Sequence, residues 1–272
     1  GIYLSQPFSE YDERSRTVVF ADAGQTAGAV QMIMKTVTLD REKIYEGNLI
    51  LVNEKNPIRK AADIQLVPAD EKRHDILLEA KAAEALKILL NEISAGESIV
   101  CVSGYRSLAE QTEIYEDSLR ENGDVFTRKF VALPGRSEHQ SGLAIDLGLN
   151  ADSVDFICPD FPHSGICQRF REKAAKFGFI QIYEKGKEKI TGISCEPWHF
   201  RYTGLPHSEV IKQRELALEE YIDFIKNCSS EYPLEFQNTC IYYVPASEGL
   251  TEINLPEDKA YQISGNNKDG FI

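Results

Sequence analysis

The sequence lacks two features that would point to a membrane or a nucleic acid. It contains no run of about 18 apolar residues, so no segment is predicted to span a bilayer as a helix. It also lacks an excess of positive charge, because 30 Lys and Arg stand against 43 Asp and Glu, which gives a net charge of −13. Nucleic-acid phosphates and membrane surfaces attract clustered Lys and Arg. The chain is therefore predicted to bind no nucleic acid and to carry no membrane-surface helix.

Cysteine is also too scarce, and too scattered, to build a disulfide scaffold or a zinc knuckle. The chain has 6 cysteines in 272 residues and no Cys-x-x-Cys. Cys158 with Cys167, and Cys228 with Cys240, each flank a loop, and spacing alone does not decide whether either pair forms a bridge. Cys195 is interpreted as a packing residue, with a role as a metal thiolate as the alternative.

What the chain does have is enough length and apolar content for a folded core. With 272 residues and a hydrophobic fraction of 42%, it is expected to form one large domain, or one domain with an appendage. Its first residue is Gly1 rather than Met, which leaves room for a removed signal or anchor segment.

The first group of candidate active-site residues lies in Ser137–Asp146, with the sequence Ser-Glu-His-Gln-Ser-Gly-Leu-Ala-Ile-Asp. His139 and Asp146 are separated by Gly142 and by the apolar run Leu143–Ile145. The apolar run is typical of a short buried strand, and glycine allows the chain to turn before it. Asp146 is therefore expected to lie near His139.

The second group lies in Glu196–His199, with the sequence Glu-Pro-Trp-His. A catalytic zinc ion takes three protein ligands, usually His or carboxylate, and keeps one position open for water. His139, Asp146 and His199 would supply these ligands, and Glu196 would lie beside the water. Taken singly, each histidine could be an ordinary hydrogen-bonded residue and Asp146 a turn or cap residue. The complete set predicts a metallohydrolase.

Arg106 is a further candidate because of its place in the chain. It follows a predicted buried strand at Ser98–Val102 and precedes a helix whose start is marked by the capping-box pair Ser107 and Glu110. Functional side chains often lie at such junctions, and acyl transfer at zinc uses a fixed cation near the developing oxyanion. The alternative is a solvated surface arginine.

Hydrophobic spacing predicts the remaining elements. The expected helices cover residues Ala82–Ile93 and Arg169–Phe177, and a long helix capped by Ser208 and continuing to Ile225. The expected strands are Leu49–Val52, Phe179–Ile182, Ile190–Ile193, Thr239–Val244 and Ala260–Ile263. The stretches Thr17–Ala21 and Ala29–Thr38 are expected to be loosely structured or to form a peripheral hairpin.

Three stretches carry a resemblance to a known family. Ser103–Ser107 (Ser-Gly-Tyr-Arg-Ser), Ser137–Asp146 and Glu196–Arg201 (Glu-Pro-Trp-His-Phe-Arg) look like the motifs of the zinc D-alanyl-D-alanine carboxypeptidases of VanY type. This group is related to the D-Ala-D-Ala dipeptidases and, more distantly, to the hedgehog signalling domain. The resemblance covers roughly residues 49–226. It implies an α+β fold, with a central antiparallel sheet, helices packed on it and a zinc cleft, plus a small C-terminal β appendage.

The resemblance also implies catalytic roles. One zinc ion per chain would be bound by His139, Asp146 and His199. Glu196 would act as the base in an attack of zinc-bound water on the terminal D-Ala-D-Ala bond of a peptidoglycan stem peptide. Arg106 would polarise the scissile carbonyl or stabilise the oxyanion.

The implied substrate-binding residues are Ser137, Gln111 and Tyr115. Ser137 would hydrogen-bond the terminal carboxylate of the substrate, and the other two would line the substrate groove. Trp198 would pack behind the zinc ligands.

Other functions of the same fold stay open at this point. A D-Ala-D-Ala dipeptidase, an L,D-carboxypeptidase and a non-catalytic zinc-binding module would share the metal ligands. Glu196 and Arg106 favour an enzyme, and the Glu-Pro-Trp-His form favours a D,D-carboxypeptidase.

The expected organisation is an N-terminal extension at residues 1–47, a catalytic domain at 48–228 and the β appendage at 229–272. Because peptidoglycan stem peptides lie outside the cytoplasmic membrane, the protein is expected in the bacterial cell envelope, anchored or secreted in its full-length form.

Overall fold

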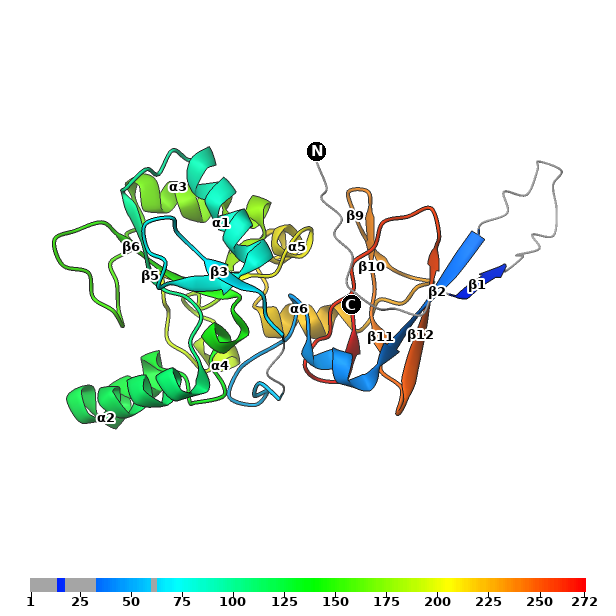
Figure 1. Ribbon diagram of the computed structural model, residues 1–272, viewed down its shortest axis with the longest axis horizontal. Coiled ribbons are helices and arrows are strands. Elements are labelled where there is room, and N and C mark those ends of the chain that lie inside the picture. Colours follow the sequence, from blue (N-terminus) through cyan, green and yellow to red (C-terminus); the bar gives the residue numbers. More distant parts are fainter. Residues whose placement is uncertain (1–13, 18–32, 60–62) are drawn as a thin grey trace.

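The computed structural model describes residues 33–59 and 63–272, together with the backbone of residues 14–17. Figure 1 shows two lobes, one built on the sheet that contains β5 and β6 and the other on the sheet that contains β2 and β12, with helix α6 (Leu218–Ile225) between them. All strand pairs in both sheets are antiparallel.

The central sheet brings together residues far apart in sequence. Its strand order is β5 (Ile99–Ser103), β6 (Ala144–Leu149), β8 (His199–Tyr202) and β7 (Phe179–Gln181). Strand β6 is central and is buried along nearly its whole length. The register places Asp146 opposite His199 on one side and next to Ser103 on the other. The sheet therefore brings the side chains of Ser103, Asp146 and His199 next to one another.

Helices cover this sheet through an apolar core. α1 (Ala80–Glu92), α3 (Gly165–Lys173) and the 3-10 turn η3 (Ala174–Phe177) pack here. The shared cluster includes Leu86, Leu89, Leu147, Phe170 and Phe200, each fully or almost fully buried. Three aromatic rings of this core, Phe161, Phe170 and Phe200, meet edge to face.

Helix α2 (Leu108–Phe130) begins directly after the strand end that carries Arg106. Ser107 caps it: its hydroxyl accepts from the Glu110 N–H, and the Glu110 carboxylate accepts from the Ser107 N–H. Gly123, with φ +78°, interrupts the helical backbone. The predicted start of this helix is confirmed.

A second apolar cluster joins the two lobes. It combines α5 (His207–Gln213) and α6 with Leu49, Leu51 and Ile241. Because Ile241 comes from the C-terminal part of the chain and Leu49 from the N-terminal part, this cluster ties both ends to the same helices.

The second lobe is a sheet made from the two ends of the chain. Its order is β1 (Arg14–Thr17), β2 (Ile33–Asp40) and β12 (Leu250–Pro256). The shorter strand pairs are β3 (Leu66–Pro68) with β4 (Leu77–Glu79), β9 (Leu234–Phe236) with β10 (Thr239–Ile241), and β11 (Val244–Pro245) with β13 (Gly270–Phe271). The remaining helical turns are η1 (Arg41–Tyr45), η2 (Glu138–Ser141) and α4 (Glu188–Thr191).

Most of the expected elements occur close to their predicted bounds, and five do not. Leu49–Val52 is not a strand, because its backbone groups bond to the Ser264 hydroxyl, the Asn266 carbonyl and side chains instead. Ile190–Ile193 is not a strand either: the Lys187 carbonyl accepts from residues 190 and 191, which forms the helical turn α4. In both places the backbone hydrogen-bond partners outweighed the apolar pattern: they are distant in sequence for residues 49–52 and local for residues 190–193.

The other three corrections lie in the C-terminal half. The long helix predicted from a Ser208 cap is two helices, α5 and α6, because Glu215 adopts φ +53° between them. Ser208 lies inside α5 rather than at its cap, and its hydroxyl donates to the Ala175 carbonyl. The predicted strand Thr239–Val244 is two short strands, β10 and β11, because the Tyr243 N–H between them donates to the Cys228 carbonyl. Ala260–Ile263 forms no strand.

Of the expected N-terminal hairpin, β2 includes the end of the second predicted stretch and pairs with β1, which shares only Thr17 with the first stretch. Residues 18–32, which hold the rest of the first stretch and the start of the second, lie outside the described residues.

All six cysteines lie within the described part of the chain and are free thiols, so neither candidate disulfide is formed. Among the helices that the structure describes, none combines the length and the apolar composition needed to cross a bilayer.

Candidate metal centre

His139 is held in place from both sides of its ring. It lies in η2, where the Ser137 hydroxyl accepts from the His139 N–H at 3.3 Å. Its ring Nδ1 lies 2.7 Å from the carbonyl oxygen of Gly104, at the end of β5. Its other nitrogen, Nε2, lies 3.1 Å from Asp146 Oδ2. A carbonyl oxygen only accepts, so Nδ1 carries the proton and the Nε2 lone pair is directed toward Asp146.

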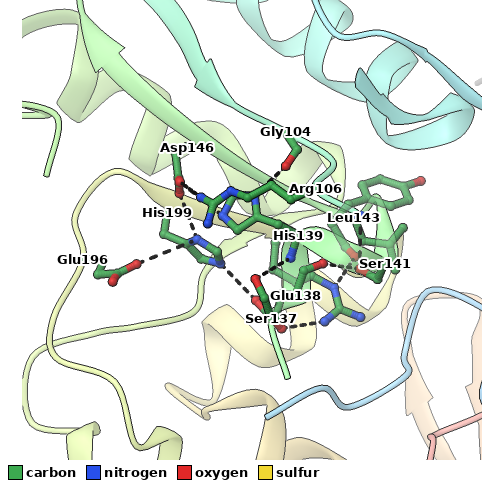
Figure 2. A network of polar contacts seen from close by, with 12 residues as sticks. Gly104, Arg106, Ser137, Glu138, His139, Ser141, Leu143, Asp146, Glu196 and His199 are labelled. Carbon is green, nitrogen blue, oxygen red and sulfur yellow. Dashed lines mark hydrogen bonds and ion pairs between the residues drawn. The ribbon is translucent and has the colours of Figure 1, made fainter. Parts of the chain in front are cut away.

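His199 approaches the same carboxylate with its opposite nitrogen. It is the residue paired with Asp146 across β6 and β8, and its Nδ1 lies 2.9 Å from Asp146 Oδ1. Ligand atoms of His139, Asp146 and His199 all lie within 4.8 Å of one another, and all three residues are buried. Figure 2 shows the two imidazoles and the carboxylate converging.

Glu196 lies beside this group on the Nδ1 side of His199. Its Oε2 is 3.8 Å from His199 Nδ1, and it is 5% exposed. Its backbone N–H donates to the Tyr183 carbonyl, and its own carbonyl accepts from the His199 N–H in a tight turn. The turn, rather than the strand predicted before it, positions this carboxylate.

Arg106 is bound on three sides. Its Nε donates to Ser103 Oγ at 2.8 Å, one terminal nitrogen to Gln111 Oε1 at 3.1 Å, and the other to Asp146 Oδ2 at 2.9 Å. Its side chain is only 14% exposed. Arg106 is therefore a fixed charge at the site rather than a mobile surface residue.

A cavity opens onto these groups. The predicted site residues that line it are Arg106, Ser137, His139, Asp146, Glu196 and His199, and Trp198 lines it too. Gln111 and Tyr115 do not line it. Gln111 is buried and bonds Arg106 and the Ala132 carbonyl, so it contacts the site through Arg106.

Comparison with known proteins assigns this chain to a family. The model of the family described as VanY, D-alanyl-D-alanine carboxypeptidase, matches residues 75–205. The bifunctional D-Ala-D-Ala dipeptidase and D-Ala-D-Ala carboxypeptidase VanXYC of Enterococcus gallinarum is 45% identical over 179 residues, which are 65% of this chain and 94% of that protein. A D-alanyl-D-alanine carboxypeptidase of Enterococcus faecium is 33% identical over 250 residues, 86% of this chain and 77% of its own.

The chain belongs to the VanY family. The resemblance inferred from the three motifs is thus confirmed. The family model matches a shorter range than the expected 49–226, and the alignment with the Enterococcus faecium carboxypeptidase is longer than that range.

Two solved structures extend this relationship to the fold. The vancomycin-resistance D,D-dipeptidase VanXYg, in complex with a D-Ala-D-Ala phosphinate analogue, is 54% identical with a TM-score of 0.86, covering 88% of this chain and 97% of that one. The D,D-pentapeptidase VanY from a VanB-type resistance cassette, in complex with Zn(II), is 32% identical with a TM-score of 0.55, covering 65% and 99%. The chain thus has the expected mixture of helices and antiparallel sheets, and this architecture is consistent with a VanY-like fold.

In this VanY-family chain the donor set fits a zinc ion. It comprises two imidazole nitrogens and a carboxylate oxygen, all buried and close together, and it is the one such group found among the described residues. Each ligand also has a partner behind it, since Gly104 bonds His139, Arg106 bonds Asp146 and Glu138 bonds His199. Zinc is the ion named in the VanY complex.

Burial and charge set the protonation of these groups. Burial alone would raise the pKa of Asp146, but His139 and His199 outweigh it and hold that pKa well below its usual range. Burial and the Arg106 charge lower the pKa of His139. Burial opposes the charged form of His199, yet its bonds with Asp146 and Glu138 raise its pKa to about 10. Burial raises the pKa of Glu196 to about 8. A metal that binds His199 Nδ1 must therefore displace a proton.

Three residues of the site were missed by the sequence analysis. Glu138 bonds His199, Arg201 bonds Glu138, and the Tyr183 ring lies 4.7 Å from the His199 ring, centroid to centroid. One signal was available: Arg201 lies two residues after His199 in an otherwise apolar strand, so both point to the same face. Nothing local distinguished Glu138 or Tyr183.

Proposed function

We propose that this chain is a zinc D,D-carboxypeptidase that removes the terminal D-Ala from peptidoglycan stem peptides ending in D-Ala-D-Ala. The observation that carries the proposal is the convergence of His139, Asp146 and His199 beside a buried Glu196, at a cavity also lined by Arg106. Each of these residue types has a defined part in peptide hydrolysis.

His139 through Nε2, Asp146 through its carboxylate and His199 through Nδ1 would hold the zinc ion. When bound, the ion supplies Lewis-acid polarisation of a carbonyl and activation of a water molecule.

Glu196 is proposed as the general base. Its carboxylate is buried next to the metal ligands, and burial brings its pKa to about 8, close to the pH at which the enzyme would work. A nearby dication favours the charged form of a carboxylate. Glu196 would take a proton from the attacking water and return it to the amine of the leaving D-Ala.

Arg106 and Ser137 are proposed to contact the substrate. Ser103, Gln111 and Asp146 hold the Arg106 guanidinium rigidly, so it provides a pre-placed positive charge for the developing oxyanion. The Ser137 oxygen accepts from the His139 N–H, which leaves its own O–H to donate to the substrate carboxylate. Tyr115 and Gln111 remain proposals as groove residues, with Gln111 acting through Arg106.

Dipeptidase activity is the second candidate function. It is favoured by the 54% identity to VanXYg, a D,D-dipeptidase, over 88% of this chain. Because VanXYC is named as having both activities, one site of this kind accommodates both substrates in a relative.

Release of D-Ala tests the proposal. The zinc-loaded chain is incubated with a stem pentapeptide ending in D-Ala-D-Ala, with free D-Ala-D-Ala and with a stem tetrapeptide, and His139→Ala serves as the control. Release from the pentapeptide supports the carboxypeptidase, release from the free dipeptide supports the second candidate, and release from the tetrapeptide indicates L,D activity. A protein that holds zinc and releases D-Ala from none of them would be a non-catalytic module, and the proposal would fail.

We further propose that the site lies in a zinc cleft of a catalytic domain at residues 48–228, flanked by an N-terminal extension at 1–47 and a C-terminal β appendage at 229–272. The position of all candidate ligands within 48–228 supports this division. The pairing of β2 with β12 places the two flanking parts in one sheet.

The protein is also proposed to act in the bacterial cell envelope, outside the cytoplasmic membrane. The support is the substrate class of the D-alanyl-D-alanine carboxypeptidase relative. Fractionation of cells that express the full-length gene tests this, and recovery from the cytosol alone would contradict it.

A further inference from the structure

Glu138 lies between the candidate site residues Ser137 and His139 in the sequence, but its side chain does not line the cavity. It is 1% exposed and is not among the cavity-lining residues. Its Oε2 accepts from His199 Nε2 at 3.0 Å, on the side of the imidazole opposite Asp146 and Glu196 (Figure 2). Since a carboxylate oxygen accepts, this bond keeps the proton on Nε2 and leaves the Nδ1 lone pair for a metal.

Arg201 holds Glu138 in that position. It is fully buried, and one terminal nitrogen donates to Glu138 Oε1 at 2.6 Å. The other donates to the carbonyl oxygens of Asn48 at 2.9 Å and Ile50 at 2.8 Å. A buried ion pair adds little net stability compared with apolar packing of the same volume. The Glu138–Arg201 pair therefore acts on His199 through the direction of its hydrogen bonds, not through added stability.

The Asn48 and Ile50 carbonyls, which accept hydrogen bonds from Arg201, belong to a segment that the C-terminal part of the chain holds in place. The Leu49 N–H donates to Ser264 Oγ at 2.9 Å, and the Leu51 N–H donates to the Asn266 carbonyl at 3.2 Å. The Asn267 side-chain amide donates to the Leu51 carbonyl at 2.8 Å. These contacts are buried. They explain why residues 49–52 are not a strand despite their apolar pattern.

We propose that Glu138 and Arg201 are positioning residues that fix the tautomer and orientation of His199, and that residues 264–267 support them through the segment 48–51. Hydrogen bonds then run without a gap from the C-terminal segment to the imidazole. The inference rests on the proposed zinc site, and it assigns to the C-terminal part of the chain a role in metal binding.

The first test replaces Glu138 in the full-length chain. In Glu138→Gln the shape is kept, but one of the two oxygens becomes an N–H donor facing either Arg201 or His199. Outer partners of metal ligands typically contribute about 10- to 100-fold to metal affinity, and a loss in this range is expected. Zinc affinity is measured by chelator competition, and the site geometry by the visible absorption spectrum of the Co(II)-substituted protein.

A control separates positioning from general stability. Tyr221→Phe removes another hydrogen bond of a buried side chain, the one between the Tyr221 hydroxyl and His207 Nδ1, away from the metal ligands. It is expected to lower the unfolding midpoint and leave zinc affinity unchanged. Should Glu138→Gln fail to fold, Glu138→Asp keeps the charge on a side chain one methylene shorter and is expected to weaken zinc binding as well.

The tautomers give a direct readout in the wild-type chain. Long-range ¹⁵N–¹H correlation spectra of the zinc-loaded protein should show His199 protonated at Nε2 and His139 at Nδ1. Protonation of His199 at Nδ1 would overturn the proposal.

The second test addresses the C-terminal segment. Asn267 has φ +60°, so Asn267→Gly removes its amide without straining the backbone. Gln237→Gly, at φ +52° in an exposed turn, is the matched control. A several-fold loss of zinc affinity is expected in Asn267→Gly and none in the control; unchanged affinity in both would refute the part assigned to residues 264–267.

The outcomes distinguish this inference from the proposed function. Wild-type affinity and an unchanged Co(II) spectrum in Glu138→Gln would refute the positioning role while the zinc site stands. A wild-type chain that binds no zinc would refute both.

Discussion

At the scale of single residues, the two histidines present opposite nitrogens to the same carboxylate. His139 is fixed by a backbone carbonyl at Nδ1, whereas His199 is fixed by the Glu138 carboxylate at Nε2. Asp146 receives both rings and Arg106 as well. No one of these side chains specifies the site, because each ring could face either way without its outer partner.

Glu196 is expected to matter for turnover and not for zinc binding. In Glu196→Gln the zinc content should stay at about one ion per chain, since the metal ligands are unchanged. The rate of D-Ala release should fall about 10²- to 10⁴-fold, the usual effect of losing a general base. Zinc content and D-Ala release are measured on one preparation. A variant that keeps zinc and near-normal release would mean that another group activates the water.

At the scale of elements, the site depends on the close approach of β4 to the end of β5. The Leu77 carbonyl of β4 accepts from the Tyr105 N–H at 2.7 Å. Gly104, immediately before Tyr105, provides the carbonyl for His139. A Cβ atom on Gly104 would lie 2.2 Å from the Leu77 oxygen. Glycine is therefore required here by space.

Gly104→Ala is accordingly expected to damage both stability and metal binding. The added methyl must push β4 and β5 apart, and overpacking of this kind costs about 1–3 kcal/mol or more. Movement of the Gly104 carbonyl should also weaken zinc binding. Urea unfolding and chelator competition are the measurements. Gly249→Ala, where a Cβ would meet nothing within 4 Å, is the control and should behave as wild type.

At the scale of the whole molecule, the buried site couples folding to protonation. In the zinc-free protein the pKa of Glu196 is raised to about 8 and that of His199 to about 10. The ordinary pKa is near 4.5 for Glu196 and 6.5 for His199. At a pH between the ordinary and the raised pKa of either group, the folded chain binds more protons than the unfolded chain. The free energy of unfolding therefore falls as the pH rises through this range.

The zinc-free protein should thus lose on the order of 2 kcal/mol or more of stability between about pH 7 and pH 9. Urea unfolding in the presence of a chelator measures this. Glu196→Gln should show a shallower fall, because one of the two groups no longer titrates. Bound zinc should remove most of this fall, since it displaces the His199 proton from the folded chain. Stability of the zinc-free chain that rises over this range would contradict the assignment.

The two lobes are expected to fold together. Ile241 and the C-terminal Ile272 pack with α5, α6, Leu49 and Leu51 in one cluster, and β12 pairs with β2. A chain that ends at Cys228 would expose that cluster. Its unfolding free energy should fall by more than about 3 kcal/mol, because removing even one large buried aliphatic side chain costs about 2–5 kcal/mol. An unchanged unfolding midpoint after truncation would instead support an independent catalytic domain at 48–228.

Features that depend on neighbouring residues could be predicted from the amino-acid sequence. The capping box of Ser107 and Glu110, the apolar spacing of α1 and the left-handed Gly142 before β6 are such features, because each is decided by residues only a few positions apart. The candidate ligands were recognised in the same way, from residue types at short spacings within two motifs.

Contacts between groups far apart in sequence could be identified only in the folded structure. The bond between Glu138 and His199 joins residues 61 apart in sequence, and that between Arg201 and Asn48 joins residues 153 apart. Hydrophobic periodicity reports burial along one element and carries no information on the partner of a buried polar atom. For the same reason residues 49–52 were misread as a strand: their apolar side chains are buried as predicted, but their backbone bonds go to the C-terminal segment rather than to a neighbouring strand.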